Sequence, residues 1–254
     1  MYTRIKLLFL LILFQAVIVF ADEQPSFIKL DLPLFDLPYQ IDAMNTVGHG
    51  FFSAYANPSM AQSLAVTTNI YSAAHFGLRT MYNNWEGNKI VRNIVYYGGI
   101  GVADMLLLYV PGGHGWMHEE FHRSIMSRYQ VHSFNMMNTF PIGQAQVYVK
   151  NVRDEDLERF KEESPANFVR MHSAGGEGEI LLVDGLQKNN FFYNQNIPNE
   201  FFYWLAAFNV WQYAFSAFSP FTDNPELKNE ATIQERDFTG HDYTSWVYDL
   251  FRPK

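Results

Sequence analysis

The stretch from Pro111 to Arg128, which reads PGGHGWMHEEFHRSIMSR, constrains the fold more than any other part of the chain. A proline and two glycines at its start break any preceding element, and neither residue recurs between Trp116 and Arg128. His118 and His122 are four residues apart, so on a helix both rings lie on one face and can point at a single ion. The stretch therefore predicts a helix that carries two neighbouring metal ligands.

Glu119 gives this histidine pair its chemical meaning. The order His118-Glu119-Glu120-Phe121-His122 is a His-Glu-x-x-His sequence. Neutral imidazole pairs suit Zn²⁺, and a glutamate beside the first histidine can reach a water molecule at the metal without binding the metal itself. Glu119 is therefore the candidate general base, as in zinc metalloproteases. A surface helix with several histidines is the plain alternative.

Two other uses of these histidines are weaker. Glu119 and His122 also form the Glu-x-x-His element of four-helix di-iron proteins, but these need a second such element, and the sequence contains none elsewhere. His114 continues the four-residue spacing, yet the outer two of three such histidines would lie about 12 Å apart along the axis. We expect His114 beside the site, at its entrance, or in the loop before the helix.

A catalytic zinc site needs a third protein ligand and keeps its fourth position for water. The further histidine of the metzincin pattern is missing after His122. The stretch Pro165 to Lys188 contains two glutamates among small residues, in AGGEGE, and small residues let a helix approach the metal helix closely. Glu177 is the predicted third ligand, Glu179 the alternative and His172 a further option. A glycine turn with both glutamates in solvent is the opposing interpretation.

With a distal glutamate ligand, His118, Glu119 and His122 resemble the gluzincins, zinc peptidases with two helical histidines and a downstream glutamate. The resemblance covers roughly the middle third of the chain and implies a zincin-like active-site helix with one zinc ion per chain. The family's acidic residue four positions after the ligand, which orients the first histidine, is missing: Leu181 and Val183 stand at that spacing from the two candidate glutamates. The surrounding sequence also resembles bacterial membrane-associated metallopeptidases.

The first residues predict export. Arg4 and Lys6 precede a long apolar run, and a small residue suited to cleavage ends the stretch from Met1 to Ala21. An uncleaved anchor helix is the alternative. Residues 22–254 are then expected to form a single metallopeptidase-like domain. The chain has no cysteine, which excludes disulfides and cysteine ligands and is common among exported bacterial proteins. The formal charge of -8 argues against a nucleic-acid partner.

Two long apolar runs, residues 94–110 and 200–219, point to a membrane. Asp104 is the only charge in the first run, and aromatic residues make up 17% of the chain. Either run could span a membrane, lie at its interface, or pack inside a water-soluble core. Asp104 would be a functional candidate in lipid and a satisfied hydrogen-bonding residue in a core.

Together these patterns predict a mainly α fold with a minor β element. Helices are expected over residues 59–83, 154–163 and 240–251, a loop over 131–141 and one strand within 144–152. The expected function is zinc-dependent hydrolysis of a peptide or protein substrate by an exported protein, membrane-associated or periplasmic/extracellular. Tyr148 and His172 are candidates for stabilising the oxyanion. The alternative is an exported membrane or surface protein with a non-catalytic, structural metal site.

Overall fold

The computed structural model describes residues 28–31, 59–108, 110–137, 147–150, 152–193, 197–216 and 242–251. These contain helices α3 (Met60–Asn83), α4 (Lys89–Leu107), α5 (His114–Arg128), α6 (Asp154–Glu163), α7 (Pro165–Tyr193), α8 (Ile197–Ser216) and α10 (Asp242–Phe251), and strands β1 (Phe134–Met137) and β2 (Val147–Lys150). The predicted mainly α fold with a minor β element is confirmed. The predicted signal, Met1 to Ala21, lies outside the described residues, as does the end of the run at 200–219.

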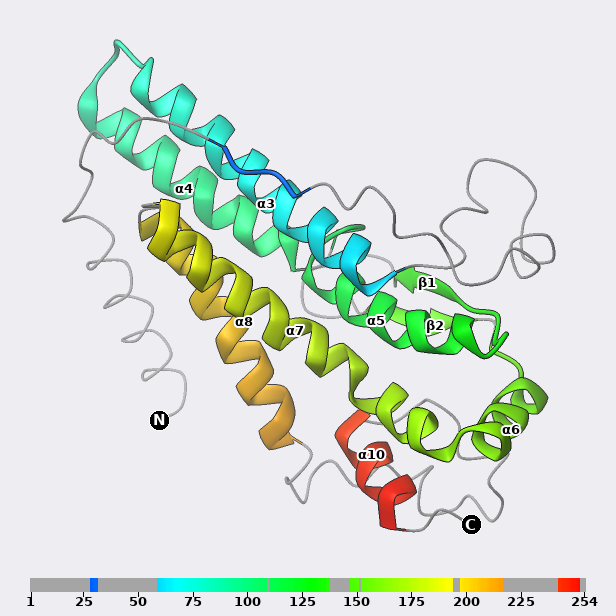
Figure 1. Ribbon diagram of the computed structural model, residues 1–254. Helices are drawn as coiled ribbons and strands as arrows, with labels where there is room; N and C mark the ends of the chain where they lie inside the picture. The colour runs from blue at the N-terminus through cyan, green and yellow to red at the C-terminus, as the bar shows by residue number, and fades with distance from the viewer. Residues whose placement is uncertain are drawn as a thin grey trace, which may run out of the picture.

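Long helices packed side by side form the body of the molecule. α3 and α4 make one antiparallel pair and α7 and α8 another, and α5 lies between α3 and α7 (Figure 1). α6 and α10 pack at the end of α7 away from the tip of the α3–α4 pair. This arrangement puts α5, the helix with the His-Glu-x-x-His sequence, in the middle of the fold.

Local sequence accounts for where several helices begin. The Ser59 side chain accepts a hydrogen bond from the Gln62 backbone N–H and caps α3, and Asn88 caps α4 in the same way. Pro165 occupies the first position of α7, where a missing N–H leaves no bond unmade, and separates this helix from α6. The helices predicted over residues 59–83, 154–163 and 240–251 are confirmed to within two residues.

α5 starts two residues earlier than the Trp116 suggested by the sequence, because its first turn is built on a tight glycine bend. Gly112 has φ +78°, a conformation that favours glycine, and its carbonyl accepts a hydrogen bond from the Thr67 hydroxyl on α3. The side chains of Met117 and Phe121 are then fully buried in the main core. The predicted metal helix is therefore confirmed as a helix and is fixed at its start by α3.

The glycines of α7 bring two other helices close to it. A Cβ atom on Gly175 would overlap the His118 ring, and one on Gly178 would lie 2.8 Å from the Phe121 ring, both on α5. A Cβ atom on Gly176 would overlap the Tyr243 hydroxyl on α10. The predicted close approach of this segment to the metal helix is confirmed. The glycine-turn interpretation is wrong, because these residues lie within a continuous helix.

A two-stranded antiparallel sheet packs beside α5. β1 pairs with β2 with Asn135 opposite Val149, and the Asn135 side chain donates to the Trp116 carbonyl and to the Glu120 carboxylate. β2 confirms the strand predicted within residues 144–152. The loop predicted for 131–141 is wrong for β1, whose short sequence lacks a clear alternating pattern and becomes a strand by pairing with β2.

α4 is the one helix among the described residues that is long and apolar enough to cross a membrane, by length and composition alone. Only 22% of its most apolar window is buried, so it is not a core helix of the described structure. Asp104 is nevertheless fully buried and lies 2.6 Å from His75 Nε2 on α3. The one charged side chain of the run thus faces inward and has a hydrogen-bond partner, while five large apolar side chains of the run are exposed: Ile94, Val95, Val102, Met105 and Leu106.

Candidate metal centre

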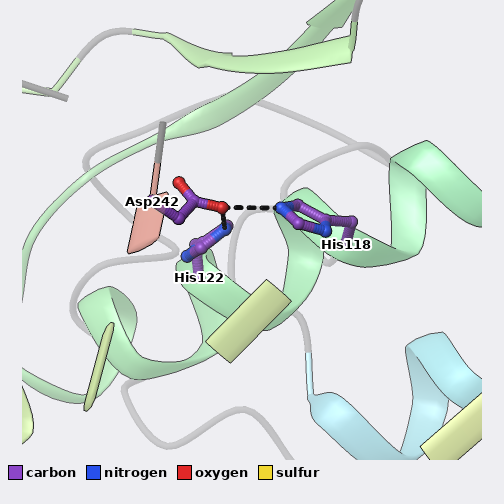
Figure 2. Close-up of side chains that lie close together, drawn as sticks. All are labelled: His118, His122 and Asp242. Carbon is purple, nitrogen blue, oxygen red and sulfur yellow. Dashed lines mark hydrogen bonds and ion pairs between the residues drawn. The ribbon is translucent and has the colours of Figure 1, made fainter. Parts of the chain in front are cut away.

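Three side chains from two helices converge on one point. His118 Nε2 lies 2.9 Å and His122 Nε2 3.1 Å from the same oxygen, Oδ2 of Asp242. The two rings belong to α5, with centroids 4.9 Å apart, and Asp242 is the first residue of α10 (Figure 2). One ligand atom from each residue lies within 4.8 Å of the other two. This group could hold a metal ion.

The opposite ring nitrogens of the two histidines have partners of their own. His122 Nδ1 lies 2.6 Å from the Met171 carbonyl oxygen, which can only accept, so Nδ1 carries a proton and, when the ring is neutral, Nε2 carries a lone pair. His118 Nδ1 lies 3.1 Å from Oε1 of Glu179. Metal-binding histidines are commonly held in this way, by a carboxylate or carbonyl behind the ring. Both rings are therefore orientated with Nε2 towards Asp242.

The donor set fits a divalent cation. Two Nε2 lone pairs and a carboxylate oxygen would repel one another at these distances unless a proton or a metal ion lies among them. Ligand atoms of a tetrahedral zinc site are about 3.3 Å apart when each is about 2.0–2.1 Å from the ion. The separations of 2.9 and 3.1 Å are close to that value, so a small outward shift would admit the ion. Two nitrogens and one oxygen would leave a fourth position open.

The pKa shifts of the three residues also indicate that the site favours a positive charge beside Asp242. Burial opposes protonation of the histidines, but hydrogen bonds to Asp242 and Glu179 raise the pKa of His118 well above its ordinary value. The pKa of His122 is raised as well, chiefly by the charge of Asp242 acting against burial. Burial alone would raise the pKa of Asp242, but His122 and His118 hold it well below its ordinary range. The site thus favours an anionic carboxylate with positive charge next to it.

Glu179 supports the site from α7. Its Oε1 atom accepts a hydrogen bond from the Asn209 amide at 2.9 Å and lies 3.6 Å from Nε2 of His114. Both Glu179 and His114 are buried. His114 is therefore found behind the metal centre, in agreement with the expectation that it would lie beside the site. Glu179 orients His118, the first histidine of the pair. In gluzincins this task belongs to an acidic residue four positions after the ligand, which the sequence lacks.

Glu119 lies beside the centre without being one of the three converging groups. It is half-buried on α5. Burial raises the pKa of its carboxyl, while the charges of His118 and His122 act in the opposite direction. Glu119 is therefore close enough to both histidines for their charges to act on its carboxyl.

The structure does not bring two of the predicted ligand candidates to the histidines. Glu177 is on the outer side of α7, where both of its oxygens accept hydrogen bonds from the Arg170 guanidinium. His172 is buried but binds Asp249, with Nε2 and Oδ2 2.8 Å apart. Glu177 fails for a geometric reason: the glycine side of α7 faces α5, and Glu177 is turned away from that side, whereas Glu179 faces it.

Asp242 is the residue that the sequence did not reveal. It is 120 residues beyond His122, and an acidic residue in the first turn is ordinary at the start of any helix. Tyr243 likewise carries no sequence signal. Its hydroxyl packs against Gly176, and burial, together with the nearby Glu179 charge, raises its pKa. Tyr148, the sequence-based candidate for the oxyanion, lies half-buried on β2.

Comparison with known protein families, curated proteins and solved structures finds no match to this chain. Its function is therefore inferred from the site itself.

Proposed function

We propose that the chain is a zinc-dependent metallopeptidase with a zincin-like active-site helix. His118, His122 and Asp242 would hold the zinc ion, and Glu119 would be the general base. One observation carries the proposal: two histidine Nε2 atoms share one carboxylate oxygen, at 2.9 and 3.1 Å, and Glu119 lies close enough for the charges of both rings to act on its carboxyl. The expected substrate is a peptide bond in a peptide or protein.

Zinc suits this donor set better than the hard cations do. Calcium and magnesium bind through oxygen atoms, while imidazole nitrogens suit zinc and the neighbouring transition metals. Two histidines and one carboxylate also hold iron(II) in oxygenases. Glu119 favours the hydrolytic proposal over that one, because a carboxylate base beside the metal has a defined task in hydrolysis.

The residues of the chain divide the proposed reaction among them. Zinc, when bound, supplies a Lewis acid that polarises a carbonyl and lowers the pKa of water. Glu119 accepts a proton from the attacking water and then delivers it to the nitrogen of the leaving amine. Glu179 and the Met171 carbonyl keep the two histidine rings in their orientation throughout.

The alternative function is a structural metal site in an exported membrane or surface protein. Its support is that the group links α5 to α10 and so could serve only to hold these helices together. Glu119 separates the two functions, since a structural site needs no base next to an open position.

The test is the variant Glu119→Gln, which keeps size and polarity but removes the base. We expect it to keep one zinc ion per chain and to lose about 10²–10⁴-fold in turnover, the usual contribution of positioned acid–base catalysis. A proteome-derived peptide library, digested by the wild type and by each variant, offers substrates of every sequence class, so the cleavage specificity need not be chosen beforehand. The matched control is Glu162→Gln, an exposed glutamate on α6.

Identical cleavage patterns from the wild type and Glu119→Gln, with zinc in both, would contradict catalysis by this residue and favour the structural function. Elemental analysis that finds no bound metal in the wild type would refute the metal site itself, and iron in place of zinc would refute the proposed ion.

A further inference from the structure

Two neighbouring helices expose many large apolar side chains. We call this set the outer apolar face; it comprises Ile90, Val91, Ile94, Val95, Val102, Met105 and Leu106 on α4, and Trp204, Phe208, Trp211 and Phe215 on α8. α4 and α8 contact each other. At 100° per residue, the α4 members cover an arc of about 160° around the helix, and the α8 members form one narrow stripe.

The area of this face is large for a protein surrounded by water. Each of the four α8 rings is more than half exposed, with Trp211 at 68%. Since an aromatic side chain has about 150–250 Å² to bury, these rings alone expose roughly 500 Å². The largest apolar patch on a typical soluble monomer is about 300–600 Å². The α4 side chains come in addition, so the outer apolar face exceeds that range.

The interior behind the face contains many polar side chains. The buried side of α3 carries Ser63, Thr67, Thr68, Ser72 and His75 together with Ala65 and Tyr71, and α4 buries Asp104 together with Tyr96, Ile100 and Leu107. On α4, the buried Asp104 reaches inward to His75 while its neighbour Met105 is exposed. Polar side chains that face inward, on helices whose outer side is apolar, are typical of helices packed in a membrane. The surface helices of a water-soluble bundle carry their polar side chains on the outside.

The shape of the face also favours lipid over a protein partner. From Ile90 to Leu106 the α4 stripe is about 24 Å long at 1.5 Å per residue, close to the hydrocarbon thickness of about 30 Å. The stripe is convex and covers almost half of the helix circumference. A single partner helix would cover only a narrow strip of this surface, whereas lipid acyl chains can cover all of it. Apart from the buried Asp104, the charged residues of α4 are Lys89 and Arg92. Both lie at the start of the helix.

We propose that the outer apolar face lies in the hydrocarbon region of a lipid bilayer. The α3–α4 pair then enters the membrane with Lys89 and Arg92 at its far end. Asn209, on α8, donates to Glu179, so the metal centre lies on the inner side of α8 and is separated from the lipid by that helix. This placement does not depend on the proposed catalysis.

The absence of cysteine from the chain makes a direct test simple. Single cysteines at Val102 and Phe208, and at the exposed Glu162 of α6 as control, are labelled with a nitroxide in the full chain. The protein is reconstituted in vesicles of phosphatidylethanolamine and phosphatidylglycerol. Collisions with oxygen, which concentrates in lipid, and with a water-soluble nickel chelate are then measured by electron paramagnetic resonance. A label at Ile90 tests the depth, because this residue begins the stripe.

We expect oxygen collisions to exceed nickel collisions at Val102 and Phe208, the order to reverse at Glu162, and Ile90 to fall between them. Nickel collisions at Val102 and Phe208 as frequent as at Glu162 would place the face in water and overturn the proposal. Low collision rates with both reagents would overturn it too, because they show a face covered by protein, and spin–spin broadening would identify a second copy as the cover.

Discussion

Replacing Asp242, the proposed third metal ligand, gives the sharpest test of the metal site. Asp242→Asn keeps the shape of the side chain but removes the negative charge that contacts Nε2 of His118 at 2.9 Å and of His122 at 3.1 Å. We expect this variant to bind zinc much more weakly than the wild type, because an amide oxygen is a poor substitute for an anionic ligand.

The size of the loss can be worked out from the number of ligands. A four-ligand protein zinc site is worth about 10–16 kcal/mol, or roughly 2.5–4 kcal/mol per ligand. Losing one ligand should therefore raise the zinc Kd by about 10²–10³-fold. Glu179→Gln weakens only the group that orients His118, so a smaller loss of about 10–100-fold is expected. Glu177→Gln breaks an exposed ion pair with Arg170 and should leave the Kd unchanged.

The assay is competition for zinc against a chromophoric chelator, with circular dichroism to verify that each variant is folded. The order of loss is the result to watch: Asp242→Asn first, Glu179→Gln second and Glu177→Gln last. A loss at Glu177→Gln as large as at Asp242→Asn would refute the reasoning, since it would return the ligand role to Glu177. Undiminished zinc affinity in Asp242→Asn would also refute the reasoning, because it would show that Asp242 is not a metal ligand.

Two further predictions follow from the same residues. Gly175→Ala should destabilise the protein and weaken zinc binding, because the new Cβ would overlap the His118 ring. The control is Gly185→Ala on the same helix, whose Cβ meets nothing within 4 Å, so it should be neutral or stabilising by up to about 1 kcal/mol. Urea denaturation and zinc titration of both variants check this. The raised pKa values of His118 and His122 stabilise the metal-free fold fully below the ordinary histidine pKa, and this stability should be lost as the pH rises through their folded-state pKa values. Metal-free protein should therefore become less stable with rising pH, whereas zinc-loaded protein should not. Thermal denaturation at several pH values checks this, and the same pH dependence in both forms would contradict the expectation.

The sequence could predict the half of the site that lies on one helix. The spacing of His118 and His122 is a property of consecutive residues, and a helix of known geometry converts it directly into a shared face. The glycine-rich stretch was predictive for a similar reason, because a helix surface without side chains allows close packing. The rotation of α7 about its axis decides which glutamate of that stretch faces α5. Glu177 and Glu179 are two residues apart and lie on nearly opposite sides of the helix, so only one of them can face α5.

Asp242 could not be predicted because its role is created only by tertiary packing. Nothing in the residues around it differs from an ordinary helix start, and its partners His122 and His118 are 120 and 124 residues away. The outer apolar face shows the same limit. The run at 94–110 is equally apolar in a core or in lipid, and only the packing of α4 against α3 shows that Asp104 is inside and Val102 outside.

The position of Asp242 would also give a metal ion bound at this site a role in assembling the fold. α10 carries two acidic residues seven apart, which lie on one face of the helix. Asp242 contacts the two histidines of α5, and Asp249 binds both Lys161 of α6 and His172 of α7. α10 is thus attached through a carboxylate near each end. A cation between Asp242 and the histidines would convert one of these attachments into metal–ligand bonds, so metal binding and the docking of α10 are coupled, and each should strengthen the other.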